Sequence, residues 1–179
     1  MRKVLVAIAL FTAGACGGST PAPRSPSWLE AVWTGSDPGR ISAAAFAEWC
    51  DTLRLLEVRA IQGDTGLALA IYPSDTVAPG EYRVRPAGRG DALRPRAAAA
   101  VRWFGELAIS GFRGDSGSVV LDGVKAGVPL SGSFDIRARA LGGSGRLNVR
   151  GSFGGLTVRS APPGCAGQVE GPPADTGVN

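Results

Sequence analysis

The sequence contains no histidine. This absence excludes the Ser-His-Asp triad, in which a histidine takes the proton of the nucleophilic serine. It also removes the imidazole nitrogen that many transition-metal sites use, and the chain has only three cysteines to replace it. The carboxylates of Asp64, Asp75, Asp91 and Asp115 lie in separate predicted loops without the dense spacing of a calcium loop. We therefore expect no metal and no cofactor.

A strong excess of positive charge is also missing. The chain has 19 Lys and Arg against 15 Asp and Glu, and without Arg2 and Lys3 the balance is 17 − 15 = +2. Two spare charges do not supply the dense basic stripe that neutralises phosphates. Nucleic acid is therefore not an expected partner.

No apolar run is long enough to span a bilayer. The longest begins at Val4, and about 12 apolar residues cover only about 18 Å as a helix, against a hydrocarbon core of about 30 Å. Arg2 and Lys3 precede this run and the small residues Ala13-Gly14-Ala15 follow it, which is the pattern of a cleaved signal peptide. Residues 1–15 are interpreted as that peptide.

The stretch "TAGAC" that ends at Cys16 resembles the lipobox of bacterial lipoproteins. Ala13 departs from the usual Leu of that motif, and Gly17 lacks the Asp that resembles an inner-membrane retention signal. The resemblance implies that Cys16 becomes the first residue and carries lipid. It also implies a lipid-anchored protein of the cell envelope, at the outer membrane and facing the periplasm. The alternative is an ordinary signal peptide with a chance cysteine.

Two segments rich in Gly, Ser and Pro flank the central part of the chain. Residues 16–39 are interpreted as a lipidated tether and residues 167–179 as a flexible tail, because neither can bury enough apolar surface to become ordered. Within the tether, the spacing of Trp28, Leu29, Val32 and Trp33 favours one short helical turn.

Residues 40–166 are predicted to form one β-rich domain. Apolar runs at 53–61 and 67–72 flank a Gly-Asp turn and read as a hairpin. Residues 41–49 and 97–104 are rich in alanine, which favours helix, but turn residues crowd their ends and we interpret both as strands. The predicted fold is all-β: an antiparallel β-sandwich or small barrel of about 8–10 strands.

Residues 131–153 give the clearest hairpin. Its apolar positions alternate on both arms, and pairing them around a four-residue Gly/Ser loop places Arg137 opposite Arg150. The other face carries a possible anion-facing patch of Arg137, Arg139, Arg146 and Arg150. Such a patch would contact lipid headgroups, an acidic glycan or an envelope protein, and the alternative is a solvated strand face.

Cys50 and Cys165 bracket nearly the whole domain. In an oxidising envelope they would pair, and the first and last strands would then be neighbours. The alternative is two separate buried thiols.

Several motifs are similar to catalytic signatures. "GDSG" around Ser116 resembles the nucleophile stretch of chymotrypsin-like proteases, and Asp-Thr-Gly at 64–66 and 175–177 resembles that of aspartic proteases. The first lacks a histidine, and all of these residue types favour turns. "RGD" at 89–91 and 113–115 resembles an integrin-binding tripeptide and is interpreted as chance. We therefore predict no catalytic residue.

The segments from "AEWC" to "PPGC", about residues 40–166, resemble uncharacterised bacterial lipoproteins with a β-rich body. Those families have no assigned activity, and the match contains no catalytic motif. Our leading hypothesis is a lipid-anchored, non-catalytic binding or structural module. One alternative is a lipocalin-like carrier of a small apolar ligand. A second is a hydrolase that uses carboxylates.

Overall fold

The computed structural model describes residues 27–86, 94–105, 108–124, 128–162 and 165, and all regular elements in these ranges are strands. The expected tether up to residue 26 and the tail 167–179 lie outside them. The strands are β1 (Trp28–Gly35), β2 (Gly39–Cys50), β3 (Leu55–Gln62), β4 (Thr65–Tyr72), β5 (Gly80–Arg83), β6 (Arg96–Phe104), β7 (Ile109–Gly123), β8 (Leu130–Ala140), β9 (Arg146–Leu156) and β10 (Val158–Ser160).

Eight of these strands form a closed antiparallel barrel. The sheet order runs β1-β9-β8-β7-β6-β4-β3-β2, and the pairing of β1 with β2 closes it. The short strand β5 pairs with the second half of β7, and β10 pairs in parallel with the end of β2. The prediction of an all-β sandwich or small barrel is confirmed, and the barrel is the form adopted.

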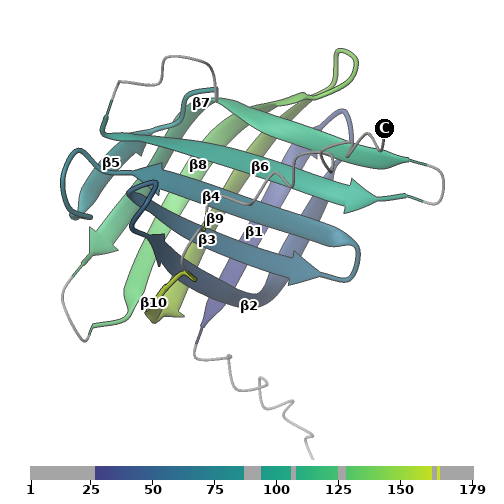
Figure 1. Ribbon diagram of the computed structural model, residues 1–179. Coiled ribbons are helices and arrows are strands. Elements are labelled where there is room, and N and C mark those ends of the chain that lie inside the picture. The colour runs from purple at the N-terminus through teal and green to yellow at the C-terminus, as the bar shows by residue number, and fades with distance from the viewer. Residues whose placement is uncertain (1–26, 87–93, 106–107, 125–127, 163–164, 166–179) are drawn as a thin grey trace, which may run out of the picture.

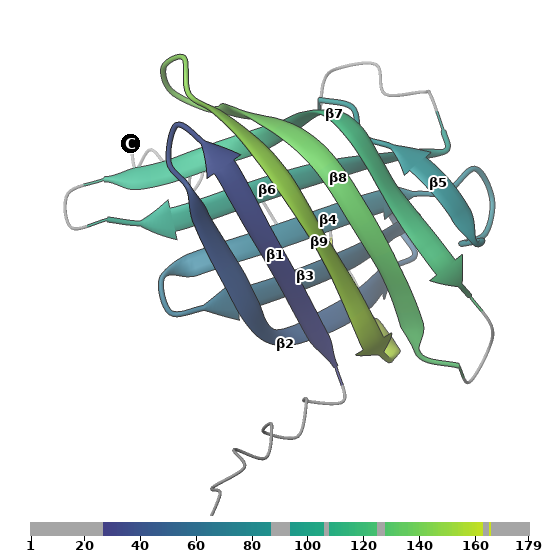
Figure 2. The same ribbon diagram turned by 180° about the vertical axis from the view of Figure 1, so that it is seen from behind.

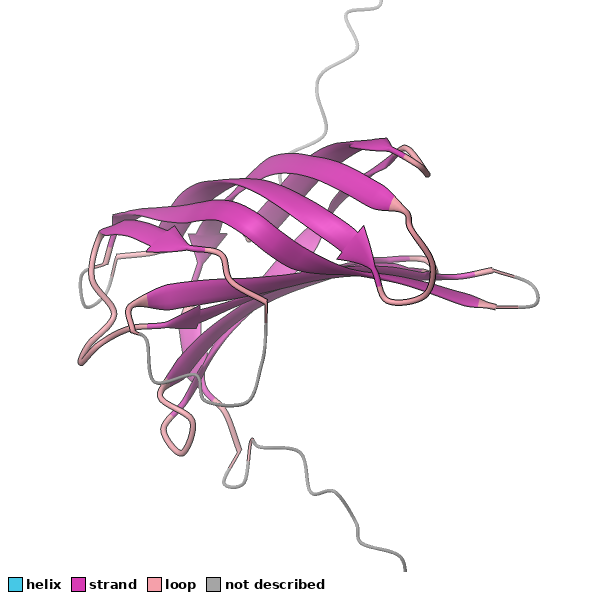
Figure 3. Ribbon diagram, turned by 90° about the horizontal axis from the view of Figure 1, so that it is seen from above, coloured by secondary structure: helices cyan, strands magenta, loops and turns pink. Residues whose placement is uncertain are grey.

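The barrel is flattened into two layers whose strands cross. In Figure 1, β3, β4 and β6 run across the front, while β1, β8 and β9 run steeply behind them. Figure 2 shows the second layer from its own side. Seen from above, the two curved layers face each other (Figure 3). The space between them holds the apolar core.

The core follows from strict alternation along each strand. On β1, for example, Leu29, Ala31 and Trp33 are at most 4% exposed while Glu30 and Val32 between them are exposed. Alternate residues of a strand point to opposite faces, so one apolar set fills the barrel. Several of the inward positions are alanine, among them Ala45, Ala60 and Ala97.

The interpretation of residues 16–39 as a tether with a short helical turn is wrong for its last part. Trp28–Gly35 is a barrel strand, paired with β2 on one side and β9 on the other. Trp28, Leu29, Val32 and Trp33 match the spacing of a helix. The same segment also has apolar residues at every second position, Leu29, Ala31 and Trp33, which is the spacing of a strand. The period of two prevails because both neighbouring strands offer backbone hydrogen bonds and an apolar interior.

Other sequence predictions hold in outline. The alanine-rich segments 41–49 and 97–104 lie in strands β2 and β6, and residues 53–72 contain the hairpin β3–β4, which turns at Gly63 and Asp64.

The β8–β9 hairpin is present with its apolar faces inward, but the predicted register is wrong by two residues. Arg137 faces Asn148, and Asp135 faces Arg150. A shift of two keeps every side chain on its face, so the apolar pattern did not distinguish these registers.

The two copies of "GSF" in this hairpin interlock. Phe134 lies opposite Gly151, and Phe153 lies opposite Gly132. A Cβ atom at Gly132 would lie 2.7 Å from Cζ of Phe153, and one at Gly151 would meet the ring of Phe134. Each glycine therefore leaves the space that the phenylalanine of the other copy occupies.

The two ends of the barrel differ. At one end, which we call the aromatic end, Trp33 stacks on Trp103 with ring centroids 6.2 Å apart, and Trp103 stacks on Phe112 at 5.3 Å. These rings come from β1, β6 and β7 and close the interior. At the opposite end, which we call the disulfide end, Cys50 at the end of β2 is bonded to Cys165.

Candidate functional site

An apolar pocket opens at the disulfide end. Its volume is about 380 Å³, within the range of about 300–1,000 Å³ typical of small-molecule sites. It is lined by Trp49, Leu56, Val77, Gly123, Val124, Val128, Pro129, Leu130, Thr157 and Val158. None of these lining residues carries a charge. Their side chains have two polar groups, the hydroxyl of Thr157 and the indole N–H of Trp49. The pocket therefore suits an uncharged apolar group.

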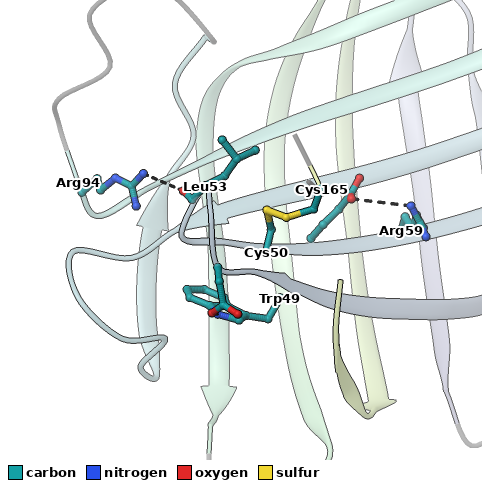
Figure 4. Close-up of a disulfide and its surroundings, with 8 residues drawn as sticks. Trp49, Cys50, Leu53, Arg59, Arg94 and Cys165 are labelled. Carbon is teal, nitrogen blue, oxygen red and sulfur yellow. Dashed lines mark hydrogen bonds and ion pairs between the residues drawn. A yellow bond between two sulfur atoms is a disulfide. The ribbon is translucent and has the colours of Figure 1, made fainter. Parts of the chain in front are cut away.

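Several contacts hold the wall of this pocket. The indole Nε1 of Trp49 donates a hydrogen bond to Oδ1 of Asp51 at 2.6 Å, which fixes the ring at the edge of the pocket. The disulfide Cys50–Cys165, with Cα atoms 5.9 Å apart, ties the residue after Trp49 to the chain that follows β10 (Figure 4). The predicted bridge is thus present, and the alternative of two separate thiols does not apply.

The loop between β2 and β3 is held by a second set of contacts. The guanidinium of Arg94 donates to the backbone oxygen of Leu53 at 3.0 Å (Figure 4). It also donates to the backbone oxygen of Arg54 at 3.1 Å. Arg54 itself has a positive φ of 47° and pairs with Asp75 at 2.7 Å. These bonds connect the loop with the chain after β4 and keep the disulfide end ordered around its opening.

The interior of the barrel, by contrast, is filled. Between Leu67, Leu69, Val101, Ile136 and Val149 the free volume is only about 10 Å³. A buried water needs at least about 10–15 Å³ by the same measure. This part of the core therefore has no room for a ligand.

The described chain begins beside the pocket. The hydroxyl of Ser27 donates to the backbone oxygen of Gly155 at 2.9 Å, and Ser27 lies with Thr157 along one shallow groove. Thr157 also lines the pocket. The segment that precedes Ser27 therefore joins the barrel next to the pocket opening.

The four arginines of the predicted anion-facing patch all lie exposed on the outer face of β8 and β9. The structure changes the membership of the patch. Arg150 is neutralised, because its Nε lies 2.8 Å from Oδ2 of Asp135. Arg113 on β7 joins the patch, because it lies directly opposite Arg139.

The remaining basic patch consists of Arg113, Arg137, Arg139 and Arg146 with one carboxylate, that of Asp115. A register shift in β7 between Gly114 and Ser116 forms a β-bulge that presents Asp115, and its Oδ2 lies 3.1 Å from Nη2 of Arg139. Bulges of this kind redirect a side chain. Sequence reasoning missed Arg113 because it lies outside the hairpin, on a strand whose register the sequence did not reveal.

Two of the three motifs that are similar to catalytic signatures lie in the β3–β4 hairpin and in strand β7. Asp64 is exposed in the tight β3–β4 turn and accepts a hydrogen bond from the Thr65 hydroxyl at 3.2 Å. Ser116 lies within β7, half-buried on the outer face opposite Arg137. The second Asp-Thr-Gly, at 175–177, lies outside the described residues.

The described part of the chain has neither a cluster of metal-ligating side chains nor a helix that could span a membrane. Within it, no group of three or more Asp, Glu, His or Cys side chains is placed to hold a metal ion. In the same ranges no helix has the length and apolar character needed to cross a bilayer.

Comparison with known proteins adds no relative. No protein-family profile matches the sequence, and no curated protein and no solved structure is significantly similar to the chain. The pocket and the surface of the barrel are therefore the features that bear on function.

Proposed function

We propose that this protein is a lipid-anchored, non-catalytic binding module of the cell envelope that takes an apolar ligand group into the pocket at the disulfide end. The apolar pocket of about 380 Å³ carries the proposal. A purely structural barrel does not need such an opening, and a carrier of the lipocalin kind would hold its ligand in an interior that is here filled between β4, β6, β8 and β9. The ligand site is therefore the end of the barrel.

The position of the pocket supports a link between binding and anchoring. Ser27 follows Cys16 by only 11 positions, so the intervening chain can span at most about 40 Å. Because Ser27 lies beside the pocket, a lipid on Cys16 would hold the pocket side of the barrel toward the bilayer. The disulfide at this end also fits an oxidising compartment.

Val128→Asp tests the pocket. Val128 lines it and is 55% exposed, so the variant should fold while placing a charge where an uncharged group must bind. We expect binding of an uncharged fluorescent probe, N-phenyl-1-naphthylamine, to weaken at least about tenfold, measured by fluorescence titration.

Val32→Asp is the matched control. Val32 is 58% exposed on the outer face of β1, away from the pocket, and the substitution is the same. This variant should bind the probe like the wild type. Equal binding by both variants, or no binding by the wild type, would show that the pocket does not take apolar ligands.

Cys16→Ser tests the anchor. If Cys16 is lipidated, the wild type should carry the added mass of acyl groups and should partition with the membrane fraction, because each buried CH₂ contributes about 0.8 kcal/mol to anchoring. The variant should lack both properties. Intact mass spectrometry and labelling with an alkynyl fatty acid measure the difference, and an unlabelled wild type would end the lipoprotein interpretation.

A further inference from the structure

We infer that the outer face of β7, β8 and β9 is a second binding site, which takes an acidic polysaccharide across a row of three arginines. The row consists of Arg113, Arg139 and Arg146, which lie directly opposite one another on three neighbouring strands. Since strands are about 4.8 Å apart, the row places three guanidinium groups over about 10 Å. This site is separate from the pocket, but the preference for a polysaccharide over lipid headgroups rests on the lipid anchor of the proposed function.

The charge arrangement of the row is unfavourable in the free protein. Like charges directly opposite each other on paired strands are destabilising, and the row contains two such pairs, Arg113 with Arg139 and Arg139 with Arg146. Asp115 pairs with Arg139 alone. Within the described residues, no ion pair neutralises Arg113 or Arg146. An anion that contacts the whole row would relieve both repulsions.

The surface around the row is an open sheet face that carries polar and apolar side chains; Leu141, which follows β8, is 70% exposed, and Ile109 at the start of β7 is 66% exposed. Arg137 lies two residues along β8 from Arg139, on the same face. Its in-register neighbours are Ser116 on β7 and Asn148 on β9, whose side chains add uncharged hydrogen-bonding groups. An open outer sheet face does not enclose a small anion in the way that concave sites do. It matches an extended chain that carries one carboxylate per repeating unit and hydroxyl groups between them, because each guanidinium can pair with a carboxylate in a bidentate manner.

Two observations favour a polysaccharide over other polyanions. None of the in-register neighbours of the row on β7, β8 and β9 is aromatic, whereas single-stranded nucleic acids are bound by stacking of their bases. The row also lies far from the start of the barrel: Arg146 is nine residues along β9 from Gly155, the partner of Ser27, which is about 30 Å. A barrel held to a bilayer through Ser27 would present the row away from the lipid headgroups.

Binding of polygalacturonate to the full chain carrying Cys16→Ser, so that no acyl group contributes, tests the site. We expect salt-sensitive binding in biolayer interferometry. Arg113→Gln with Arg146→Gln should weaken it about fivefold or more, because two exposed charge contacts are lost. Asp115→Asn should tighten it about twofold, because the carboxylate that pairs with Arg139 is removed. A gain of affinity cannot result from a failure to fold.

The matched control is Arg40→Gln with Arg159→Gln, which removes the same net charge from exposed positions on β2 and β10. This control should bind like the parent chain. An equal loss in both double variants would reduce the effect to net charge and overturn the site. Absence of binding would also overturn it, as would row-dependent binding to vesicles of phosphatidylglycerol and phosphatidylcholine without binding to polygalacturonate.

Discussion

Replacement of both Cys50 and Cys165 by alanine is expected to lower the free energy of unfolding by about 4–5 kcal/mol. The bridge joins residues 115 positions apart, and in the chain-entropy account a loop of about 100 residues contributes about 4.7 kcal/mol by restricting the unfolded chain. Such a loss is a large part of the stability of a typical small domain. Urea unfolding followed by tryptophan fluorescence measures it.

The control for this experiment is the native disulfide after reduction. All forms should carry Cys16→Ser, so that the third cysteine cannot form a wrong bridge. The reduced parent chain should unfold at the same urea concentration as the double alanine variant. If neither reduction nor substitution moves the midpoint, the bridge does not contribute to stability as we expect.

Phe134→Ala and Gly151→Ala should both destabilise the barrel. The first removes side-chain volume from the contact between these two residues, and the second adds a methyl group to it. Phe134 is 4% exposed, and truncation of such a ring costs about 3–5 kcal/mol. A Cβ at Gly151 would meet the Phe134 ring, the backbone oxygen of Glu30 and, at 2.8 Å, Cβ of Ala31. Overpacking of this kind costs about 1–3 kcal/mol. Chemical denaturation measures both changes.

The double variant tests whether the two positions share one space. Without the ring, part of the clash at Gly151 disappears, so the double variant should cost less than the sum of the two single ones. Gly142→Ala is the control, because a Cβ at Gly142 would have no atom within 4 Å. Strict additivity, or a loss at Gly142 as large as that at Gly151, would contradict the interlocking of Phe134 with Gly151.

The sequence was sufficient to predict the fold class, because alternating apolar positions specify the face of each strand whatever its partner is. It was not sufficient to choose a barrel over a sandwich. That choice depends on β1, which pairs with both β2 and β9. Trp28–Gly35 follows a stretch rich in Gly, Ser and Pro, and its apolar residues also match a helical spacing, so the closing strand was assigned to the tether.

The candidate sites were predictable to different degrees. The pairing of Cys50 with Cys165 and the exposure of Arg137 and Arg139 followed from the residues themselves. The pocket did not, because its lining residues come from the ends of strands and loops spread over residues 49–158. Each of these residues looks like ordinary core in the sequence, and only the closed barrel places them around one opening.

The closing strand also governs how the chain can fold. The hydrogen bond from Ser27 to Gly155 joins residues 128 positions apart, and the adjoining pairs of β1 with β9 have similar separations. Contacts between such distant residues form slowly, on a time scale of about milliseconds to seconds for all-β domains. Until β9 is complete, β1 has one unpaired edge and an apolar face without its cover. A growing or truncated chain that stops before β9 therefore exposes an aggregation-prone edge, and protection of that edge depends on the whole chain.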